Sequence, residues 1–226
     1  MKEVENMPEV QETKTVENKE TVEQTNLESI KEDLNKKYVY AKETLNILEV
    51  GFLTGKNIIL FGPGGHSKST ITEDFFRNQG IEPFVVTMGQ GMTPDRLFGG
   101  INIKKLQDSG EIEYLVENSF MNHEYVILEE VLDCPDFILE QLKDILSSKI
   151  FRNGSQVYPI KTKFIVGNTN RTREDYAKKD SSIKALMERF PLELEVKWKD
   201  YNKTTYEQLF LARFGKSDML LTYILE

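Results

Sequence analysis

The strongest structural signal in this chain of 226 residues is NIILFGPGGHSKST, residues 57–70. An apolar run, Ile58 to Phe61, leads into a glycine-rich turn, and a helix-compatible segment from Thr70 to Gln79 follows. Strand, G-x-x-x-x-G-K-[ST] and helix in this order are typical of a phosphate-binding loop, except that Ser67 stands where the second glycine is expected. The alternative is a glycine-rich turn with a chance lysine.

Elementary chemistry favours the phosphate-binding interpretation. Successive backbone N–H groups in such a loop can cradle phosphate oxygens, and the following helix turns its positive end toward the same anion. Lys68 can reach the terminal phosphates, and the Ser69 hydroxyl can bind Mg²⁺. A serine at position 67 suits the loop if that position does not need a positive φ. The candidate binding residues are Gly62, Pro63, Gly64, Gly65, His66, Ser67, Lys68, Ser69 and Thr70.

Composition limits the classes of protein that remain. No apolar stretch approaches the roughly 20 residues of a membrane span, and the acidic N-terminus has no apolar signal-peptide core, so we expect a cytoplasmic protein. The single cysteine, Cys134, excludes an intrachain disulfide and is expected to be a half-buried small residue, with a nucleophile as the alternative. The net charge of −8 argues against a broad nucleic-acid-binding surface.

Three regions are expected. Residues 1–26 hold seven glutamates and three lysines, a balance of −4, with no aromatic residue, which predicts a disordered acidic tail. A peptide that folds on contact with a partner is the alternative there. Residues 27–200 are expected to form the core, and residues 201–226 a short helical segment.

Within the core, apolar patterns alternate between strands and helices. A helical face begins at Leu27 and includes Ile30, Leu34, Tyr38, Ala41, Leu45 and Leu48. This helix is expected to pack on the core, and it could also wall a nucleoside. Strands are expected at 57–61, 84–88, 124–128, 163–167 and 192–196, with helices at 69–79, 136–148, 181–188 and 204–213. This alternation predicts an α/β fold, a three-layer αβα sandwich around a parallel sheet.

Two β-hairpin insertions are also expected. Residues 101–115 contain two short β-like runs separated by polar and glycine residues. Residues 149–159 contain Asn153-Gly154 between two further runs, a strong signal for a two-residue hairpin turn.

Two carboxylates, Glu129 and Glu130, end the apolar strand that begins near Tyr125. Acidic residues at this point in phosphate-loop ATPases help to hold Mg²⁺ and to polarise the attacking water. We therefore predict a metal role for Ser69 and Glu129 and a general-base role for Glu130. The alternative is a solvated turn.

Further polar candidates follow. Asn170, at the tip of the strand expected at 163–167, could hydrogen-bond the attacking water and the γ-phosphate, with Asn168 as the competing choice and an Asn-rich turn as the alternative. Arg189 could reach a phosphate bound to a neighbouring subunit as an arginine finger, or it could be a surface arginine in a salt bridge.

Several strings together resemble one family, the MoxR group of AAA+ ATPases, and in particular its RavA-like branch. The resemblance covers about residues 38–200 in the correct order. Its strings are the phosphate loop at 62–69, TPDRLFGG at 93–100, LQDSGE at 106–111, ILEE at 127–130, FRNG at 151–154, NTN at 168–170, DSS at 180–182 and ALMERF at 185–190. Members carry a small residue where Ser67 stands.

The resemblance implies an ATP-driven motor that remodels a protein partner. Such proteins form homo-oligomeric rings, often hexamers, and many work with a partner that carries a von Willebrand factor A domain. Within this pattern ATP and Mg²⁺ are the cofactors, Glu130, Asn170 and Arg189 are catalytic, and Arg189 acts on the neighbouring subunit. The two insertions are expected to face the pore or the substrate.

Two departures from the family pattern define the alternatives. Glu129 replaces the usual aspartate, and only residues 201–226 stand where AAA+ proteins carry a helical lid. An ATP-binding switch or scaffold with weak hydrolysis is therefore a second candidate function. A DNA-associated AAA+ protein such as a helicase loader is a third, which the acidic balance disfavours.

Overall fold

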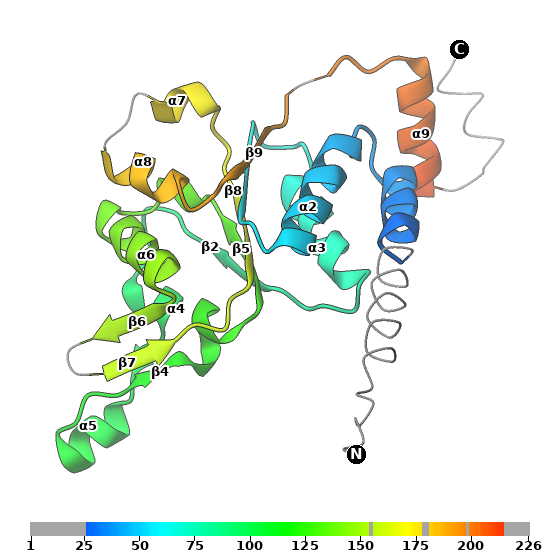
Figure 1. Ribbon diagram of the computed structural model, residues 1–226. Coiled ribbons are helices and arrows are strands. Elements are labelled where there is room, and N and C mark those ends of the chain that lie inside the picture. Colours follow the sequence, from blue (N-terminus) through cyan, green and yellow to red (C-terminus); the bar gives the residue numbers. More distant parts are fainter. Residues whose placement is uncertain (1–25, 154–155, 178–180, 198, 215–226) are drawn as a thin grey trace, which may run out of the picture.

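The chain folds around a five-stranded parallel sheet with the strand order β2-β5-β8-β1-β9 (Figure 1). A computed structural model gives this structure and describes residues 26–153, 156–177, 181–197 and 199–214. The strands are β1 (Ile58–Phe61), β2 (Phe84–Thr87), β5 (Tyr125–Glu129), β8 (Phe164–Asn168) and β9 (Leu192–Glu195). All four neighbouring pairs run parallel, so the predicted α/β sheet is confirmed.

Alternating side chains of β1 define the layers on the two faces of the sheet. Ile59 and Phe61 join one buried cluster with residues of α6 (Asp136–Ser148) and α8 (Ser181–Met187). Ile58 and Leu60 join a second cluster with α2 (Lys42–Thr54) and α3 (Lys68–Arg77). Because successive strand residues point to opposite faces, β1 is covered on both sides, and the predicted three-layer sandwich is confirmed.

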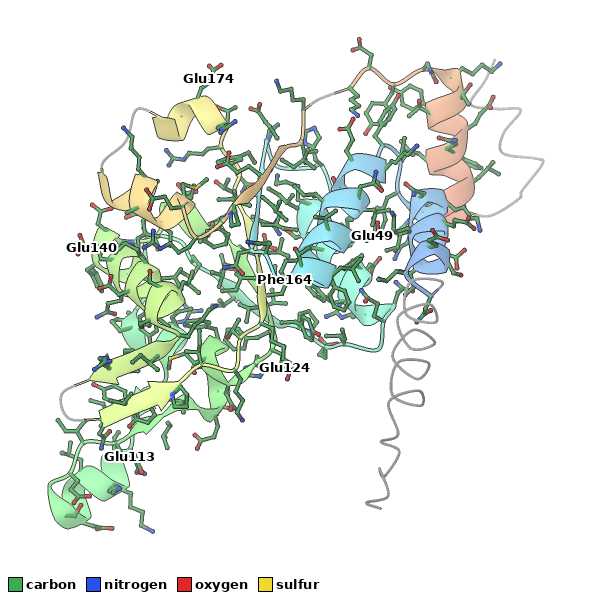
Figure 2. The ribbon with its side chains drawn as sticks, in the orientation of Figure 1. Glu49, Glu113, Glu124, Glu140, Phe164 and Glu174 are labelled. Carbon is green, nitrogen blue, oxygen red and sulfur yellow. The ribbon has the colours of Figure 1, made fainter. Side chains whose placement is uncertain are left out.

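Burial explains the composition of the central strands. All residues of β1 and β8 are buried, as the near-continuous apolar runs of a doubly covered parallel sheet require. Figure 2 shows Phe164 of β8 inside the molecule, whereas Glu140 and Glu174 lie at its periphery. The edge strand β2 alternates between half-buried and exposed residues.

The first helical region is two helices, not the single one that its periodicity suggested. A helix covers residues 26–37 and α2 begins at Lys42, because the chain turns between them and Tyr40 adopts a φ of 59°. Six of the seven residues on the predicted face are buried, and Tyr38 is half-buried. α2 ends at Gly55, where a φ of 64° suits glycine.

The first insertion differs from the expected hairpin. A helix, α5 (Ile103–Ser109), separates the short antiparallel strands β3 (Gly100–Ile101) and β4 (Tyr114–Leu115). Asn102 starts this helix, since its side chain accepts a hydrogen bond from the Lys105 N–H. The insertion therefore contains a short antiparallel pair, but a helix connects its two strands in place of the polar and glycine turn that was expected.

The second insertion is the predicted hairpin, formed by β6 (Ile150–Asn153) and β7 (Gln156–Pro159). Its register differs by one residue from the expected turn, because Asn153 pairs with Gln156. The two connecting residues, 154 and 155, lie outside the described residues. Figure 1 shows both insertions extending from the same end of the molecule, away from α2 and α9 (Lys203–Phe214).

The remaining elements are short. They are α4 (Pro94–Phe98), α7 (Arg173–Ala177) and three 3₁₀ turns at Val116–Asn118, Phe120–Asn122 and Val131–Asp133. The helix α9 agrees with the one predicted at 204–213. Across the described ranges, no helix is long and apolar enough to cross a membrane. The predicted acidic tail falls outside the described residues, except for Asn26.

Candidate functional site

The loop between β1 and α3 has the backbone that its glycines predict. Gly62 adopts a φ of 129°, and a Cβ atom there would lie 2.1 Å from the Val196 carbonyl oxygen, so only glycine fits. Gly65 also has a positive φ, of 89°. The loop therefore starts tightly against the end of β9 and opens directly into the N-terminus of α3.

Ser67 contradicts one expectation. It has a φ of 55° and a ψ of 21°, the left-handed conformation that glycine adopts without strain. The sequence argument accepted a serine here on the condition that the position does not need a positive φ, and the structure does not meet that condition. Ser67 therefore carries backbone strain of about 1–2 kcal/mol.

Lys68 is the first residue of α3 and only 6% exposed. Its amine donates hydrogen bonds to the carbonyl oxygens of Gly62, at 2.6 Å, and Pro63, at 2.8 Å. Burial lowers the pKa of Lys68, and the charge of Glu129 acts against that shift. The amine is thus held at the loop, the place where a phosphate would need it.

Ser69 and Glu129 meet although 60 residues separate them. The Ser69 hydroxyl donates to Glu129 Oε2 over 2.7 Å. The other oxygen, Oε1, accepts a hydrogen bond of 2.7 Å from the amide of Asn168. The structure thus brings the two predicted metal-binding residues together at the carboxyl ends of β5 and β8.

Glu130 and Asn170 form the next layer of the site. The Asn170 amide lies 3.5 Å from Glu130 Oε1, and both side chains come from loops that follow parallel strands. Asn170 also lines a hollow together with residues 64–70 of the loop. Asn168, in contrast, is 1% exposed and turned to Glu129. Of the two asparagines, Asn170 therefore lies beside the loop, as predicted.

Arg189 lies apart from this group. Its guanidinium donates to the Ser147 hydroxyl at 2.8 Å and the Ala185 carbonyl at 3.1 Å, and it pairs with Glu188 at 2.7 Å. These partners belong to α6, to α8 and to the residue that precedes Arg189. Within one chain, the structure does not bring Arg189 to the phosphate loop.

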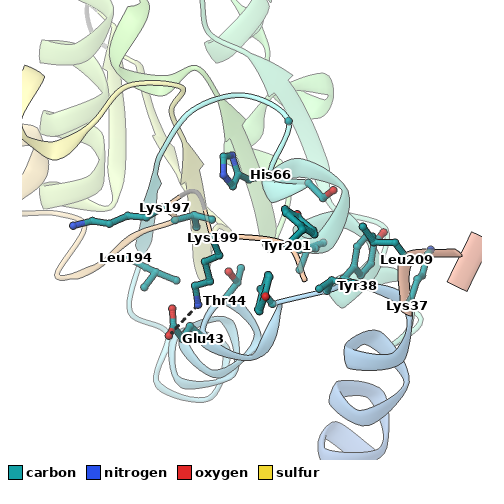
Figure 3. Close-up of a pocket in the computed structure, with 16 residues that line it drawn as sticks. Lys37, Tyr38, Glu43, Thr44, His66, Leu194, Lys197, Lys199, Tyr201 and Leu209 are labelled. Carbon is teal, nitrogen blue, oxygen red and sulfur yellow. Dashed lines mark ion pairs between the residues drawn. The ribbon is translucent and has the colours of Figure 1, made fainter. Parts of the chain in front are cut away.

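A second hollow, of about 710 Å³ including its open side, adjoins the loop at Gly65, His66 and Ser67 (Figure 3). Its other walls come from residues 37–44 and from residues 194–209. Lys199 pairs with Glu43 at 3.4 Å across this hollow.

Tyr40 connects the two walls of this hollow, which come from distant parts of the chain. Its hydroxyl donates to the Asp200 carbonyl at 3.0 Å and shares a hydrogen bond of 3.1 Å with the Thr205 hydroxyl. Its ring also packs edge-on against Tyr201, with 5.7 Å between ring centroids. Sequence reasoning placed a nucleoside wall near residues 27–48 but missed the wall at 194–209, for which the aromatic and lysine residues around position 200 were the available signal.

A parallel sheet with a glycine-rich loop after β1, a lysine and a hydroxyl at the following helix, and carboxylates at the end of β5 defines a phosphate-loop ATPase fold of the AAA+ type. Residues 25–217 match the family model of the MoxR domain in the MoxR-vWA-beta-propeller ternary systems. The chain therefore belongs to the MoxR family of AAA+ ATPases.

Two archaeal relatives and one solved structure extend this comparison. The uncharacterized proteins MJ0812 and MJ0079 of Methanocaldococcus jannaschii are each 25% identical over 149 residues, which cover 66% of this chain. The chain spans only 40% and 39% of their lengths. A crystal structure of a "putative ATPase" from Cytophaga hutchinsonii aligns with a TM-score of 0.62 at 19% identity, over 88% of this chain and 58% of that one.

Proposed function

We propose that this domain binds and hydrolyses ATP with Mg²⁺ and uses the energy to remodel a protein partner. The observation that carries the proposal is the contact of 2.7 Å between Ser69 and Glu129, with Lys68 beside it at the start of α3. These side chains would meet the β- and γ-phosphates of a nucleotide whose base and ribose occupy the hollow between residues 37–44 and 194–209.

The donor atoms fit magnesium. Mg²⁺ prefers oxygen ligands and usually combines one or two carboxylates with phosphate oxygens and water. The Ser69 hydroxyl and the Glu129 carboxylate supply that set. Phosphate oxygens and water usually complete such a magnesium site. Bound there, the metal would neutralise charge on the β- and γ-phosphates.

The chain's own residues then have distinct roles. Lys68 would leave the Gly62 and Pro63 carbonyls and pair with phosphate oxygens. Glu130 would take a proton from the water that attacks the γ-phosphorus, and Asn170, 3.5 Å from it, would orient that water. The bond between the γ-phosphorus and the β-phosphate oxygen breaks, so that ADP is released, and inorganic phosphate leaves with the oxygen atom of the water.

The proposed partners follow from the family. The matching model describes MoxR domains in systems with vWA and β-propeller proteins, and we propose a vWA-domain protein as the remodelling partner. We also propose a homo-oligomeric ring in which Arg189 acts on the nucleotide of a neighbouring subunit. Its contacts with α6 and α8 keep it apart from the phosphate loop of its own chain.

Weak hydrolysis is the competing function, and Glu129 is the observation that favours it. Glutamate is one methylene longer than the aspartate usual in the family. In this second candidate the domain is an ATP-dependent switch.

Steady-state phosphate release separates the two functions. Glu130→Gln should bind ATP normally and release phosphate about 10²–10⁴-fold more slowly than the wild type. Glu174→Gln, an exposed change on α7, is the matched control and should behave as the wild type. Equally slow phosphate release by the wild type and by Glu130→Gln would rule out the ATP-driven motor and favour the ATP-dependent switch. Native mass measurement with a slowly hydrolysed ATP analogue tests assembly.

A further inference from the structure

Asn168 occupies the centre of the candidate site but lies outside the roles assigned so far. It is the last residue of β8, which runs between β1 and β5. Asn168 is in register with Leu60 of β1, and the preceding residue, Gly167, is in register with Leu128 of β5. Asn168 therefore lies beside Glu129, at the point where three strands end.

The Asn168 amide restrains the Glu129 carboxylate. Its Nδ2 donates to Oε1 over 2.7 Å, while Ser69 donates to Oε2 over 2.7 Å. A glutamate side chain has one more rotatable bond than an aspartate and would otherwise sample more orientations. With a donor on each oxygen, one orientation of the carboxylate is fixed.

Within the part of the chain that the structure describes, the other end of the same amide has no hydrogen-bond partner. Asn168 is 1% exposed, and its Oδ1 is buried without a partner among the described residues. A buried polar atom without a partner costs free energy of folding. An apolar residue of similar size would avoid that cost but would also leave Glu129 Oε1 without its donor, so the two effects on stability oppose each other. What an asparagine provides here, and an apolar residue does not, is the bond to Glu129.

We propose that Asn168 is a positioning residue that holds Glu129 in the orientation needed for Mg²⁺-dependent nucleotide binding. This inference rests on the proposed function, since it assumes that Ser69 and Glu129 act on a metal–nucleotide complex. It assigns different roles to the two asparagines of the β8 tip. Asn168 acts through Glu129, and Asn170 lies beside Glu130 and the loop.

Equilibrium binding of ADP, measured by calorimetry with Mg²⁺ and with a chelator, tests the proposal without relying on turnover. Asn168→Leu removes the donor and the unpaired oxygen together, and Asn168→Val does the same with a smaller side chain. Both should keep the metal-free ADP affinity of the wild type. The gain in affinity that Mg²⁺ provides should fall about 10–100-fold, as for other residues that orient a metal ligand. The Tm of Asn168→Leu should stay close to that of the wild type, because removal of the unpaired oxygen offsets the loss of the bond to Glu129.

A double-mutant cycle with Glu129→Asp identifies the residue through which Asn168 acts. The shorter aspartate cannot reach both donors, so adding Asn168→Leu to Glu129→Asp should cost less than Asn168→Leu costs in the wild type. Equal costs in both backgrounds would show that Asn168 does not act through Glu129.

The other outcomes separate a failure of this proposal from a failure of the proposed ATPase function. An unchanged Mg²⁺ effect in both Asn168 variants overturns the proposal while leaving the proposed ATPase intact. Loss of metal-free ADP binding together with a lower Tm shows a structural role and also overturns it. If Mg²⁺ does not strengthen ADP binding to the wild type, the metal site of the proposed function fails first, and this inference fails with it.

Discussion

The side-chain amine of Lys68 donates a hydrogen bond of 2.6 Å to the carbonyl oxygen of Gly62, six residues earlier in the same loop. The loop thus binds its own lysine, and an incoming phosphate must replace this contact and the one to Pro63. Burial of the amine lowers its pKa, although the Glu129 charge opposes the shift.

Lys68→Ala should abolish nucleotide binding, with a loss of about 2–5 kcal/mol because a buried charge partner of the phosphates is removed. The measurement is ATP affinity by calorimetry, and the control is Lys56→Ala, a change at an exposed lysine two residues before β1. Unchanged affinity in Lys68→Ala would remove the central element of the site.

The lowered pKa of Lys68 predicts a pH dependence of stability. Between the lowered pKa and 10.5 the unfolded chain binds more protons than the folded one, so the cost of burying the charged amine decreases as pH rises. Lys68→Met should therefore be at least as stable as the wild type at neutral pH, and its relative advantage should shrink as the pH approaches 10.5. Denaturant titrations across this range would refute the idea if the difference stayed constant.

The left-handed backbone at Ser67 predicts that substitution by glycine and substitution by valine have different effects on stability. Ser67→Gly should be tolerated, with nucleotide affinity kept, since glycine adopts a φ of 55° without strain. Ser67→Val should be less stable than the wild type, and less stable than Ser67→Gly by at least about 1–2 kcal/mol, because a branched side chain resists the left-handed conformation more than serine does. Thermal unfolding and ADP affinity are the readouts, and equal stability of the two variants would contradict the backbone geometry.

Substitution of Arg189 should impair phosphate release by the neighbouring subunits. Arg189→Ala should still bind ATP, but mixed with wild-type subunits it should lower phosphate release from its neighbours. Ser147→Ala removes the hydrogen bond to Arg189 Nε and serves as the control, which should retain activity. Full activity of Arg189→Ala would make this residue a surface arginine.

The raised pKa of Tyr38 predicts a second pH dependence of the free energy of unfolding. Its hydroxyl donates to Asp74 of α3 over 2.5 Å, and burial together with this bond raises its pKa from 10.0 to about 12. The stabilisation is fully present below pH 10 and is lost as pH rises through about 12. Tyr38→Phe should cost about 1 kcal/mol at neutral pH and progressively less above pH 10. A constant difference in the free energy of unfolding would contradict this.

Most of the sheet was predictable because its strands are short apolar runs bounded by polar or glycine residues. α5 was not, because the alternating Ile101-Asn102-Ile103 is equally compatible with a strand. The capping bond from the Lys105 N–H to Asn102 decides between the two. The break near Tyr40 was missed for a similar reason, since the apolar spacing continues across it.

The site was predictable where spacing along the chain carries the chemistry, as at Lys68, Ser69, Glu129 and Glu130. The separate positions of Asn168 and Asn170 depend on how β8 lies between β1 and β5, which no local pattern encodes. The left-handed backbone of Ser67 was also hidden, because a residue type does not reveal its φ.

The bond between Tyr40 and Thr205 spans 165 positions of the chain. During synthesis the loop at 62–69 leaves the ribosome long before Thr205 exists, so the hollow beside it stays open until the C-terminal wall arrives. Contacts this distant in sequence are the slow ones to form. Truncation near residue 200 would therefore leave the sheet and the loop in place while removing Thr205 and the wall residues Tyr201 and Leu209. A nascent chain of that length would carry the loop with an incomplete second wall.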